Sequence, residues 1–245
     1  MPHRYKPVRC YQNIKQGVVS GWHIIPLDAE LDTRHTMIEL LHCDCMEYMA
    51  TVPDKYFDLS IVDPPYGIER FKKPSGTTRF KSSKLMQEEG LTWDIKPTEE
   101  YWNELFRVSK NQIVWGANNF EMPPSEYFLI WDKAQTVDNF ATAEYAWVST
   151  GLKKPAKIYR YSIHKHNHTD KIHPTQKPIA LYEWLLTNYA KKGQRILDTH
   201  LGSGSSAIAA HYFGVDFVGT ELDKDYFEAA KARFDMATKQ LAMSI

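Results

Sequence analysis

Short apolar runs alternate with amphipathic stretches along the chain from about residue 37 onward. The apolar runs are rich in β-branched and aromatic residues and have the length of buried strands, whereas the longer stretches repeat their apolar residues at helical spacing. The pattern predicts strands at residues 38–41, 57–62, 113–115, 128–131, 145–148, 195–198 and 217–220. It predicts helices at residues 46–50, 179–189 and 207–213, and two more that begin after Thr98 and Asp223.

This alternation of strands and helices predicts an α/β fold with a doubly wound, mostly parallel sheet. A chain of 245 residues can bury one core of this kind, and we expect a single domain over residues 1–245. Residues 1–36 are mixed and weakly periodic, and form an extension to which the sequence assigns no role. Residues 67–92 are polar and basic and are expected to be a loop insertion.

Composition limits where the protein works. Lys and Arg number 30, as do Asp and Glu, so the formal net charge is zero and any binding to a polyanion must come from local patches. Three cysteines are an odd count, which argues against a disulfide framework and favours a reducing compartment. No run approaches the ~20 apolar residues of a membrane span, and the first residues lack the apolar core of a signal peptide. We therefore expect a soluble, cytoplasmic protein.

The strand expected at residues 57–62 ends abruptly at Asp63-Pro64-Pro65-Tyr66. Prolines cannot donate backbone hydrogen bonds, so this segment should be a stiff loop that presents one carboxylate, unpaired carbonyls and one ring in a fixed geometry. The dipeptides Asp-Pro and Pro-Pro are also common in ordinary surface turns. The loop alone therefore does not establish a site.

Four acidic residues fall at the expected carboxyl ends of strands, namely Asp44, Asp63, Asp198 and Glu221. In open α/β sheets, ligands bind beyond the carboxyl ends of the strands. The fold would therefore bring these four carboxylates to one edge of the sheet, a coincidence that a surface turn at Asp63 does not explain. We expect a binding site at that edge.

A glycine-bearing loop joins the strand at residues 195–198 to the helix that follows it. Gly202 and Gly204 have no Cβ atom, so the backbone there can approach a ligand closely. Glu221 ends the next strand and suits two ribose hydroxyls, as the acid does in dinucleotide-binding folds. The loop also satisfies a loose Gly-x-Gly-x-x-Ala fingerprint, which makes a nicotinamide- or flavin-dependent oxidoreductase an alternative. A dehydrogenase has no use for the loop at Asp63, which argues against that alternative.

Two segments concentrate basic residues, the insertion at residues 67–92 and residues 151–173. Basic side chains with interleaved aromatic residues suit nucleic-acid binding, although solvated loops have the same composition. The candidate DNA-binding residues are Lys72, Lys73, Arg79, Lys81, Lys84, Lys157, Arg160 and His164. The second segment also carries several histidines, but no thiol or carboxylate cluster completes a tetrahedral set, so we expect no metal site.

Three motifs together resemble those of a known family. They are Asp63-Pro64-Pro65-Tyr66, His173-Pro174-Thr175-Gln176-Lys177-Pro178 and Asp198-Thr199-His200-Leu201-Gly202-Ser203-Gly204. The set is similar to that found in DNA amino-methyltransferases. These enzymes methylate the exocyclic amine of adenine or cytosine. The motif order resembles the β class of the family, over roughly residues 37–238. The resemblance implies the S-adenosylmethionine-dependent methyltransferase fold in circularly permuted form, with residues 151–173 as a short target-recognition segment.

The resemblance also implies S-adenosylmethionine as the cofactor and assigns roles to the matched residues. The catalytic residues would be Asp63, Pro64, Pro65 and Tyr66. The cofactor-binding residues would be Asp44, Thr175, Lys177, Asp198, Thr199, Gly202, Gly204 and Glu221. In this assignment Glu221 binds the ribose hydroxyls and Asp44 the adenine end. Thr175 and Lys177 would lie near the cofactor's carboxylate.

One departure from the family lies in the glycine loop. The family usually has Asp-Pro-Phe-x-Gly-x-Gly there, whereas this chain has Thr199 and His200 in place of the proline and phenylalanine. The phenylalanine normally flanks the cofactor. His200 therefore bears on the affinity for the cofactor rather than on the fold.

We predict a site-specific DNA methyltransferase that acts on N6 of adenine by base flipping and direct transfer, because cytosine-modifying relatives often have serine where this chain has Asp63. N4 of cytosine is the alternative. Methylation of RNA or of protein amides, and DNA binding without catalysis, are further alternatives. The expected partner is double-stranded DNA. The resemblance also allows a homodimer and a cognate restriction nuclease, as in bacterial, archaeal or phage restriction–modification systems.

Overall fold

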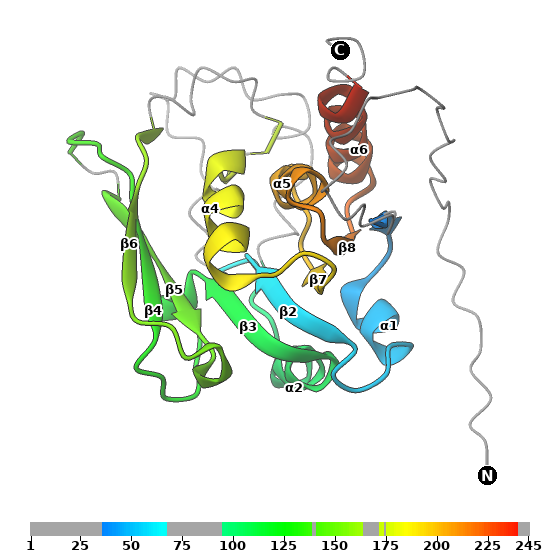
Figure 1. Ribbon diagram of the computed structural model, residues 1–245, viewed down its shortest axis with the longest axis horizontal. Helices are drawn as coiled ribbons and strands as arrows, with labels where there is room; N and C mark the ends of the chain where they lie inside the picture. The colour runs from blue at the N-terminus through cyan, green and yellow to red at the C-terminus, as the bar shows by residue number, and fades with distance from the viewer. Residues whose placement is uncertain (1–35, 68–94, 139–140, 164–171, 174, 240–245) are drawn as a thin grey trace, which may run out of the picture.

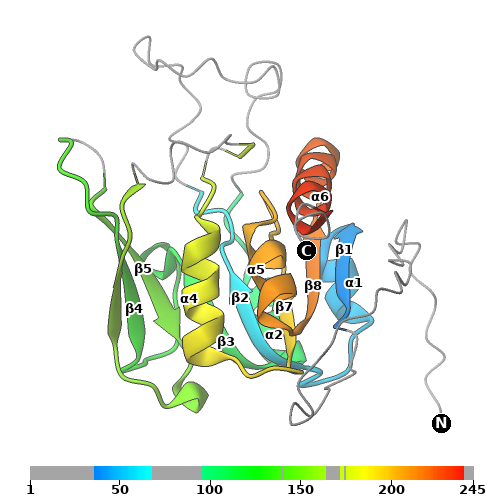
Figure 2. The same ribbon diagram turned by 45° about the horizontal axis from the view of Figure 1, so that its top comes forward.

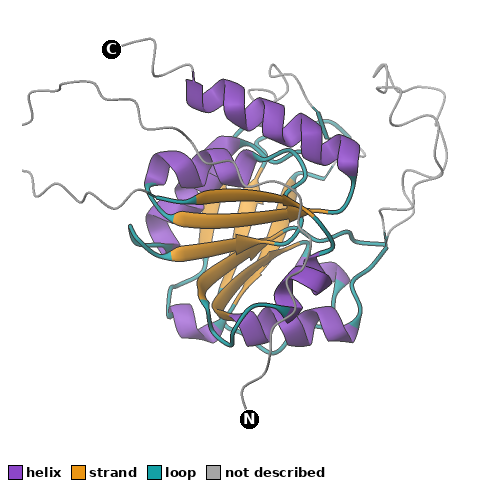
Figure 3. Cartoon of the chain, turned by 90° about the vertical axis from the view of Figure 1, so that its right-hand side faces the viewer, coloured by secondary structure: helices purple, strands orange, loops and turns teal. Residues whose placement is uncertain are grey.

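The computed structural model describes residues 36–67, 95–138, 141–163, 172–173 and 175–239 (Figure 1). The extension at residues 1–36 and the insertion at residues 67–92 lie almost entirely outside these ranges. The described chain forms one sheet with helices on both faces (Figure 3). In the same ranges, no helix combines the length and the apolar character needed to cross a bilayer.

The described part of the chain contributes eight strands to the sheet. They are β1 (Ile38–His42), β2 (Phe57–Val62), β3 (Ser109–Trp115), β4 (Phe128–Asp132), β5 (Ala143–Val148), β6 (Lys157–Arg160), β7 (Arg195–Asp198) and β8 (Asp216–Glu221). Their spatial order is β1-β8-β7-β2-β3-β5-β4-β6. Neighbouring strands are parallel except where β5 pairs with β3 and β4. The prediction of a doubly wound, mostly parallel sheet is confirmed.

The strand β6 is the element that the apolar pattern did not predict. Its four residues alternate between half-buried and exposed, so it contains no buried apolar run. It is held by its parallel pairing with β4, in which Ile130 lies opposite Ile158. Tyr159 also packs against the core and stacks on Trp184 at 5.0 Å, but an edge strand with only alternate side chains half-buried leaves little signal in the sequence.

Helices cover both faces of the sheet. On one face lie α4 (Ile179–Tyr189), α5 (Ser205–Phe213) and α6 (Lys224–Lys239), and on the other lie α1 (Cys45–Ala50) and α2 (Glu99–Val108) (Figure 3). Figure 2 shows α4 and α5 side by side in front of the strands.

Alternation along the strands explains why the sheet has an apolar core on each side. Successive side chains of a strand point to opposite faces. In β3, Ile113 and Trp115 pack with the side that α4 covers, whereas Val114 packs with the side that α2 covers. All three side chains are fully buried. These three residues therefore form the continuous apolar run seen in the sequence, whereas the polar residues 109–112 that open β3 lie outside the predicted strand.

The helix ends follow the signals in the sequence. α5 ends at Gly214, whose φ of +87° is the left-handed conformation that glycine adopts readily. α6 follows Asp223, whose carboxylate accepts hydrogen bonds from the backbone N–H groups of Asp225 and Tyr226 at 2.9 Å each. α2 begins at Glu99, directly after Thr98. These three predicted boundaries are confirmed.

The fold brings the carboxyl ends of β1, β8, β7 and β2 to one edge of the sheet. β1 and β8 are in register, with His42 opposite Glu221. β7 lies between β8 and β2 and ends at Asp198. Asp44 and Asp63 follow within two residues of the ends of β1 and β2. The predicted gathering of the four acids at this edge is therefore observed.

Replacing Leu185 of α4 with alanine is expected to lower the free energy of unfolding by about 2–5 kcal/mol, because its fully buried side chain packs in the core cluster that α4 shares with the sheet. Glu183→Ala, at an exposed position of the same helix, is the matched control and should change the free energy of unfolding by less than about 0.5 kcal/mol. Chemical denaturation measures both. Equal losses in the two variants would contradict this packing of α4.

Candidate active site

A cavity of about 1110 Å³ opens beyond the carboxyl edge of the sheet. Most of the residues expected to act in catalysis or cofactor binding line it: Asp44, Asp63, Pro64, Pro65, Tyr66, Thr175, Lys177, Thr199, Gly202 and Glu221. Asp198 and Gly204 are not part of the lining. The volume is at the upper end of small-molecule sites, so the cavity has room for more than one ligand group.

Two of the predicted DNA-binding residues are described, and neither lines the cavity. Lys157 donates to the Asn188 side chain of α4 at 2.7 Å. Arg160 donates through Nε to Asp132 at 2.7 Å, and its side chain is 77% exposed at the carboxyl end of β6. The other candidates, Lys72, Lys73, Arg79, Lys81, Lys84 and His164, lie outside the described residues.

The loop after β2 is closed by its own side chains. The Tyr66 hydroxyl donates to Asp63 Oδ1 at 2.6 Å. Burial raises the pKa of Tyr66 well above its ordinary value, and the neighbouring Asp63 carboxylate adds to this rise. The phenol therefore stays protonated and acts as a hydrogen-bond donor to Asp63.

Gly116, at the end of β3, fixes where the Tyr66 ring lies. Its φ is +65°, and a Cβ atom built there would lie only 2.1 Å from Tyr66 Cε1. The ring also meets Phe120 edge-on, with ring centroids 6.1 Å apart. Any side chain at position 116 would push the tyrosine ring away from Asp63, so Gly116 belongs to the site although the sequence did not single it out.

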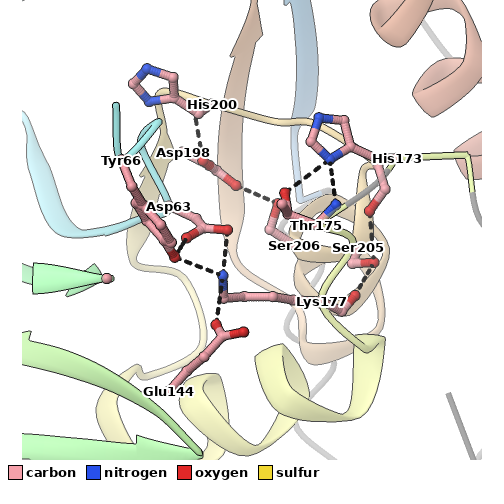
Figure 4. Close-up of polar contacts among 12 residues, drawn as sticks. Asp63, Tyr66, Glu144, His173, Thr175, Lys177, Asp198, His200, Ser205 and Ser206 are labelled. Carbon is pink, nitrogen blue, oxygen red and sulfur yellow. Dashed lines mark hydrogen bonds and ion pairs between the residues drawn. The ribbon is translucent and has the colours of Figure 1, made fainter. Parts of the chain in front are cut away.

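Lys177 forms the centre of a buried charge cluster (Figure 4). Its ammonium pairs with Asp63 Oδ2 and lies 3.1 Å from Glu144 Oε2. Glu144 also pairs with Lys133 at 2.6 Å. The Lys177 side chain is only 3% exposed, and its ammonium lies 5.7 Å from the centre of the Trp115 ring. Two acids and two bases are thus linked in one row along the wall of the cavity.

The charges in this row support one another. Burial opposes the charge on Lys177, but the carboxylates of Asp63 and Glu144 outweigh it and raise the pKa of the ammonium well above its ordinary value. Burial also opposes the charge on Glu144, but Lys177 and Lys133 hold its pKa below the ordinary value. Lys177 and Glu144 therefore both remain charged at neutral pH.

Glu144 and Lys133 are site residues that the sequence analysis missed. The sequence pattern pointed to acids at the carboxyl ends of parallel strands. Glu144 instead lies near the start of β5, which runs antiparallel to its neighbours β3 and β4. In an antiparallel strand the amino-terminal end lies at the cavity edge. The sequence did contain one signal, an acidic residue directly before the apolar residues 145–148.

The glycine loop between β7 and α5 is held by Glu221 and Arg233. The Gly202 N–H donates to Glu221 Oε2 at 2.8 Å. Arg233 of α6 donates to the Ser203 carbonyl at 2.7 Å and to the Ser205 hydroxyl at 2.9 Å. A Cβ at Gly204 would lie 3.3 Å from a backbone oxygen of α6, so this glycine allows the loop to approach that helix closely.

Asp198 supports this loop from beneath the cavity. It is 1% exposed and accepts hydrogen bonds from the Ser206 hydroxyl at 2.6 Å and the His200 N–H at 3.1 Å. Burial raises its pKa to about 7, which these two hydrogen bonds partly offset. Asp198 thus ties the start of α5 to the glycine loop.

His200 and Thr199 occupy the positions where the family pattern has phenylalanine and proline. The Thr199 hydroxyl shares hydrogen bonds with the Tyr101 hydroxyl at 2.7 Å and with His200 Nδ1 at 2.9 Å. The His200 ring meets Tyr101 edge-on at 5.5 Å. Burial lowers the pKa of His200 to about 4, so a neutral imidazole lines the cavity at neutral pH.

The segment before α4 places a second neutral imidazole at the cavity. Burial, together with nearby Lys177, lowers the pKa of His173 to about 4. Its Nδ1 lies 3.1 Å from the Thr175 hydroxyl (Figure 4). Within the described ranges, no three or more His, Cys, Asp or Glu side chains gather as they would around a metal ion.

Comparisons with known proteins agree with this geometry. Residues 118–232 match a family model described as DNA methylase, N6_N4_Mtase. The type II methyltransferase M2.DpnII of Streptococcus pneumoniae is 24% identical over 243 residues, covering 80% of this chain and 89% of that protein. The residues that the family model matches include Lys133, Glu144, Lys177 and the glycine loop. Asp63 lies outside the matched range.

Two solved structures have a similar fold. The crystal structure of the M1.HpyAVI–SAM complex matches with a TM-score of 0.52 and 20% identity, over 80% of this chain and all of that one. PvuII DNA methyltransferase, described as cytosine-N4-specific, matches with a TM-score of 0.53 and 12% identity, over 83% of this chain and 92% of that one. These likenesses confirm the methyltransferase fold, whereas its circular permutation stays a prediction.

Replacing His200 with phenylalanine is expected to flatten the dependence of stability on pH. The folded chain holds the pKa of His200 at about 4 against an ordinary 6.5, so the unfolded chain takes up a proton first as the pH falls. The stability associated with neutral His200 is therefore present above pH 6.5 and is lost towards pH 4. Urea denaturation should show a smaller loss of unfolding free energy between about pH 7 and pH 5 in the variant than in the wild type. An equal or larger loss would contradict the buried, neutral imidazole.

Proposed function

We propose that this chain, which is related to the DNA amino-methyltransferases, transfers a methyl group from S-adenosylmethionine to the N6 amine of adenine in DNA. One observation carries the proposal: the proline-braced loop at Asp63 and the glycine loop at Gly202 line the same cavity. A methyl donor held at one loop can therefore face an amine held at the other.

The residues at one end of the cavity fit S-adenosylmethionine. Asp44 and Glu221 line the cavity at the ends of the neighbouring strands β1 and β8. Carboxylates accept hydrogen bonds from hydroxyl and amino groups, which suits the ribose at Glu221 and the adenine amino group at Asp44. Gly202 presents backbone without a side chain beside them. When bound, S-adenosylmethionine supplies an electrophilic methyl group on a sulfonium centre.

The methionine end of the cofactor is assigned to Thr175 and the glycine loop. Lys177 was expected near the cofactor's carboxylate, but its ammonium is already shared by Asp63 and Glu144. We therefore assign that carboxylate to the part of the cavity lined by Thr175, Gly202 and Ser203, where the Thr175 hydroxyl can donate to it. Asp198 and Gly204 hold the glycine loop in place, and Thr199 lines the cavity beside it.

Asp63, Pro64 and Tyr66 would act on the target base. The amine lies inside the duplex, so the nucleotide must be flipped out at a cost of a few kcal/mol. Stacking on Tyr66 returns roughly 1–3 kcal/mol. Asp63 and the Pro64 carbonyl then accept the amine's two N–H hydrogens, which draws the nitrogen towards tetrahedral geometry and directs its lone pair at the methyl group. Pro65 keeps the loop stiff.

Adenine is the proposed target because position 63 is aspartate. The resemblance associates serine at this position with cytosine-modifying relatives. We propose double-stranded DNA as the partner, with Arg160 and the basic side chains of residues 67–92 on its phosphates. A homodimer and a cognate restriction nuclease stay predictions.

Asp63→Ala is expected to lower methyl transfer by at least about 10²-fold, because the amine loses its main hydrogen-bond acceptor. Binding of S-adenosylmethionine, measured by calorimetry, should stay near the wild-type value. Asp58→Ala, in the strand that precedes the Asp63 loop and also in an ion pair with a lysine, is the matched control and should keep full turnover.

The assay follows labelled methyl groups into DNA from a methylation-free host, and mass spectrometry of the digested nucleosides identifies the modified base. N6-methyladenine in the wild-type reaction supports the proposal, and N4-methylcytosine would correct the target base. Transfer only to RNA or to protein, or wild-type turnover by the Asp63 variant, would overturn it.

Gly116→Ala should abolish most turnover, by about 10²-fold, because the new Cβ displaces the Tyr66 ring from Asp63. Gly214→Ala is the matched control. It imposes a similar left-handed strain, of order 1–3 kcal/mol, but a Cβ there meets nothing within 4 Å. Gly116→Ala should lose at least as much stability as Gly214→Ala in thermal unfolding, because it adds the contact with Tyr66 to the same backbone strain, and only Gly116→Ala should lose turnover. Equal turnover in the two would show that the position of Tyr66 is not required.

A further inference from the structure

Glu144 lies on the far side of Lys177 from Asp63 and has no role in the mechanism described so far. Figure 4 shows the Lys177 ammonium between the two carboxylates. Glu144 reaches this place from β5 and lies opposite Trp131 of β4 in the antiparallel pair. Lys133, directly after β4, pairs with the other oxygen of the same carboxylate.

The count of charges shows what Glu144 contributes. Asp63 and Lys177 alone would form a neutral pair, buried and directed at each other. With Glu144, the ammonium is shared between two carboxylates, and the three groups carry one net negative charge. Lys133 balances this charge from the outer side of the cluster, where it pairs with Glu144 rather than with Asp63.

This sharing matters for the proposed transfer. As the bond from nitrogen to the methyl carbon forms, the bond from that carbon to sulfur breaks, and its electron pair stays on sulfur. Positive charge therefore moves from sulfur to the amine nitrogen, which then releases its extra proton to solvent water. An acceptor that is fully neutralised by its own lysine stabilises that developing charge poorly, whereas an acceptor that keeps negative character stabilises it well.

We propose that Glu144 is a positioning residue that shares Lys177 with Asp63 and so keeps the Asp63 carboxylate oriented and negative towards the target amine. The inference rests on the proposed methyltransferase function. Glu144 acts through Lys177, so its loss should slow the chemical step without weakening the binding of the cofactor, whose assigned contacts lie elsewhere.

The alternative is that Glu144 only anchors the β4–β5 hairpin through Lys133. The two roles predict different transfer rates for variants of Glu144 and of Lys133. Lys133→Met removes the hairpin ion pair but leaves Glu144 on Lys177, whereas Glu144→Gln removes the negative charge from both ion pairs. A positioning role makes the glutamine variant much slower than the methionine variant, and a hairpin role makes them alike.

The test measures single-turnover methyl transfer to DNA, the KM for S-adenosylmethionine and the thermal unfolding midpoint. Glu144→Gln should lower the transfer rate on the order of 10- to 100-fold, as small displacements of catalytic groups do, with KM changed by less than about twofold. Glu144→Asp, which keeps the charge, should recover part of the rate. Lys133→Met, which leaves Glu144 on Lys177, should lose clearly less of the transfer rate than Glu144→Gln.

If Glu144→Gln fails to fold because Lys133 is left unpaired, the double variant Glu144→Gln/Lys133→Met removes that cause and must still be slow. A wild-type rate in either folded variant overturns the inference, as does an equal loss in Glu144→Gln and Lys133→Met. Failure of the proposed function has a different signature, because the wild-type protein would then transfer no methyl group to DNA at all.

Discussion

The site depends on one buried ammonium held between two carboxylates. Lys177 is nearly inaccessible to water, and burying an unpaired cation costs several kcal/mol. Asp63 and Glu144 offset that cost from opposite sides, so the loop after β2, the segment before α4 and the start of β5 must all meet at one point. Removing Lys177 would leave two buried carboxylates with only Lys133 to balance them.

The parallel sheet makes this meeting possible. Carboxyl ends of parallel strands lie at one edge, which gathers Asp44, Asp63, Asp198 and Glu221, and β5 adds an acid from the opposite direction. The serine hydroxyls at the start of α5 connect the parts: Ser205 donates to the Lys177 carbonyl at 2.8 Å. The loop at Asp63 and the glycine loop are thus joined by a few hydrogen bonds between rigid elements. This suits a reaction that requires alignment of two ligands.

Sequence periodicity predicted most of the fold because its central strands are buried on both faces and its helices carry apolar residues at helical spacing. It failed for β6, an edge strand that contains no buried apolar run. The sequence also brought the loop at Asp63 and the glycine loop together, because both follow strand ends. It did not reveal the row from Asp63 to Lys133, since those contacts join residues far apart in the chain and one of them lies on an antiparallel strand. Nor did it show that Gly116 sets the position of Tyr66, which depends on packing between two loops.

The proposed arrangement requires Lys177 to serve the Asp63 carboxylate rather than the cofactor. A crystal structure with a non-reactive S-adenosylmethionine analogue and duplex DNA would distinguish these two roles. We expect Lys177 to stay paired with Asp63 and Glu144, while the exocyclic amine of a flipped base lies within hydrogen-bonding distance of Asp63 and the Pro64 carbonyl. A Lys177 ammonium bound instead to the carboxylate of the analogue, with its pair to Asp63 broken, would rule this arrangement out.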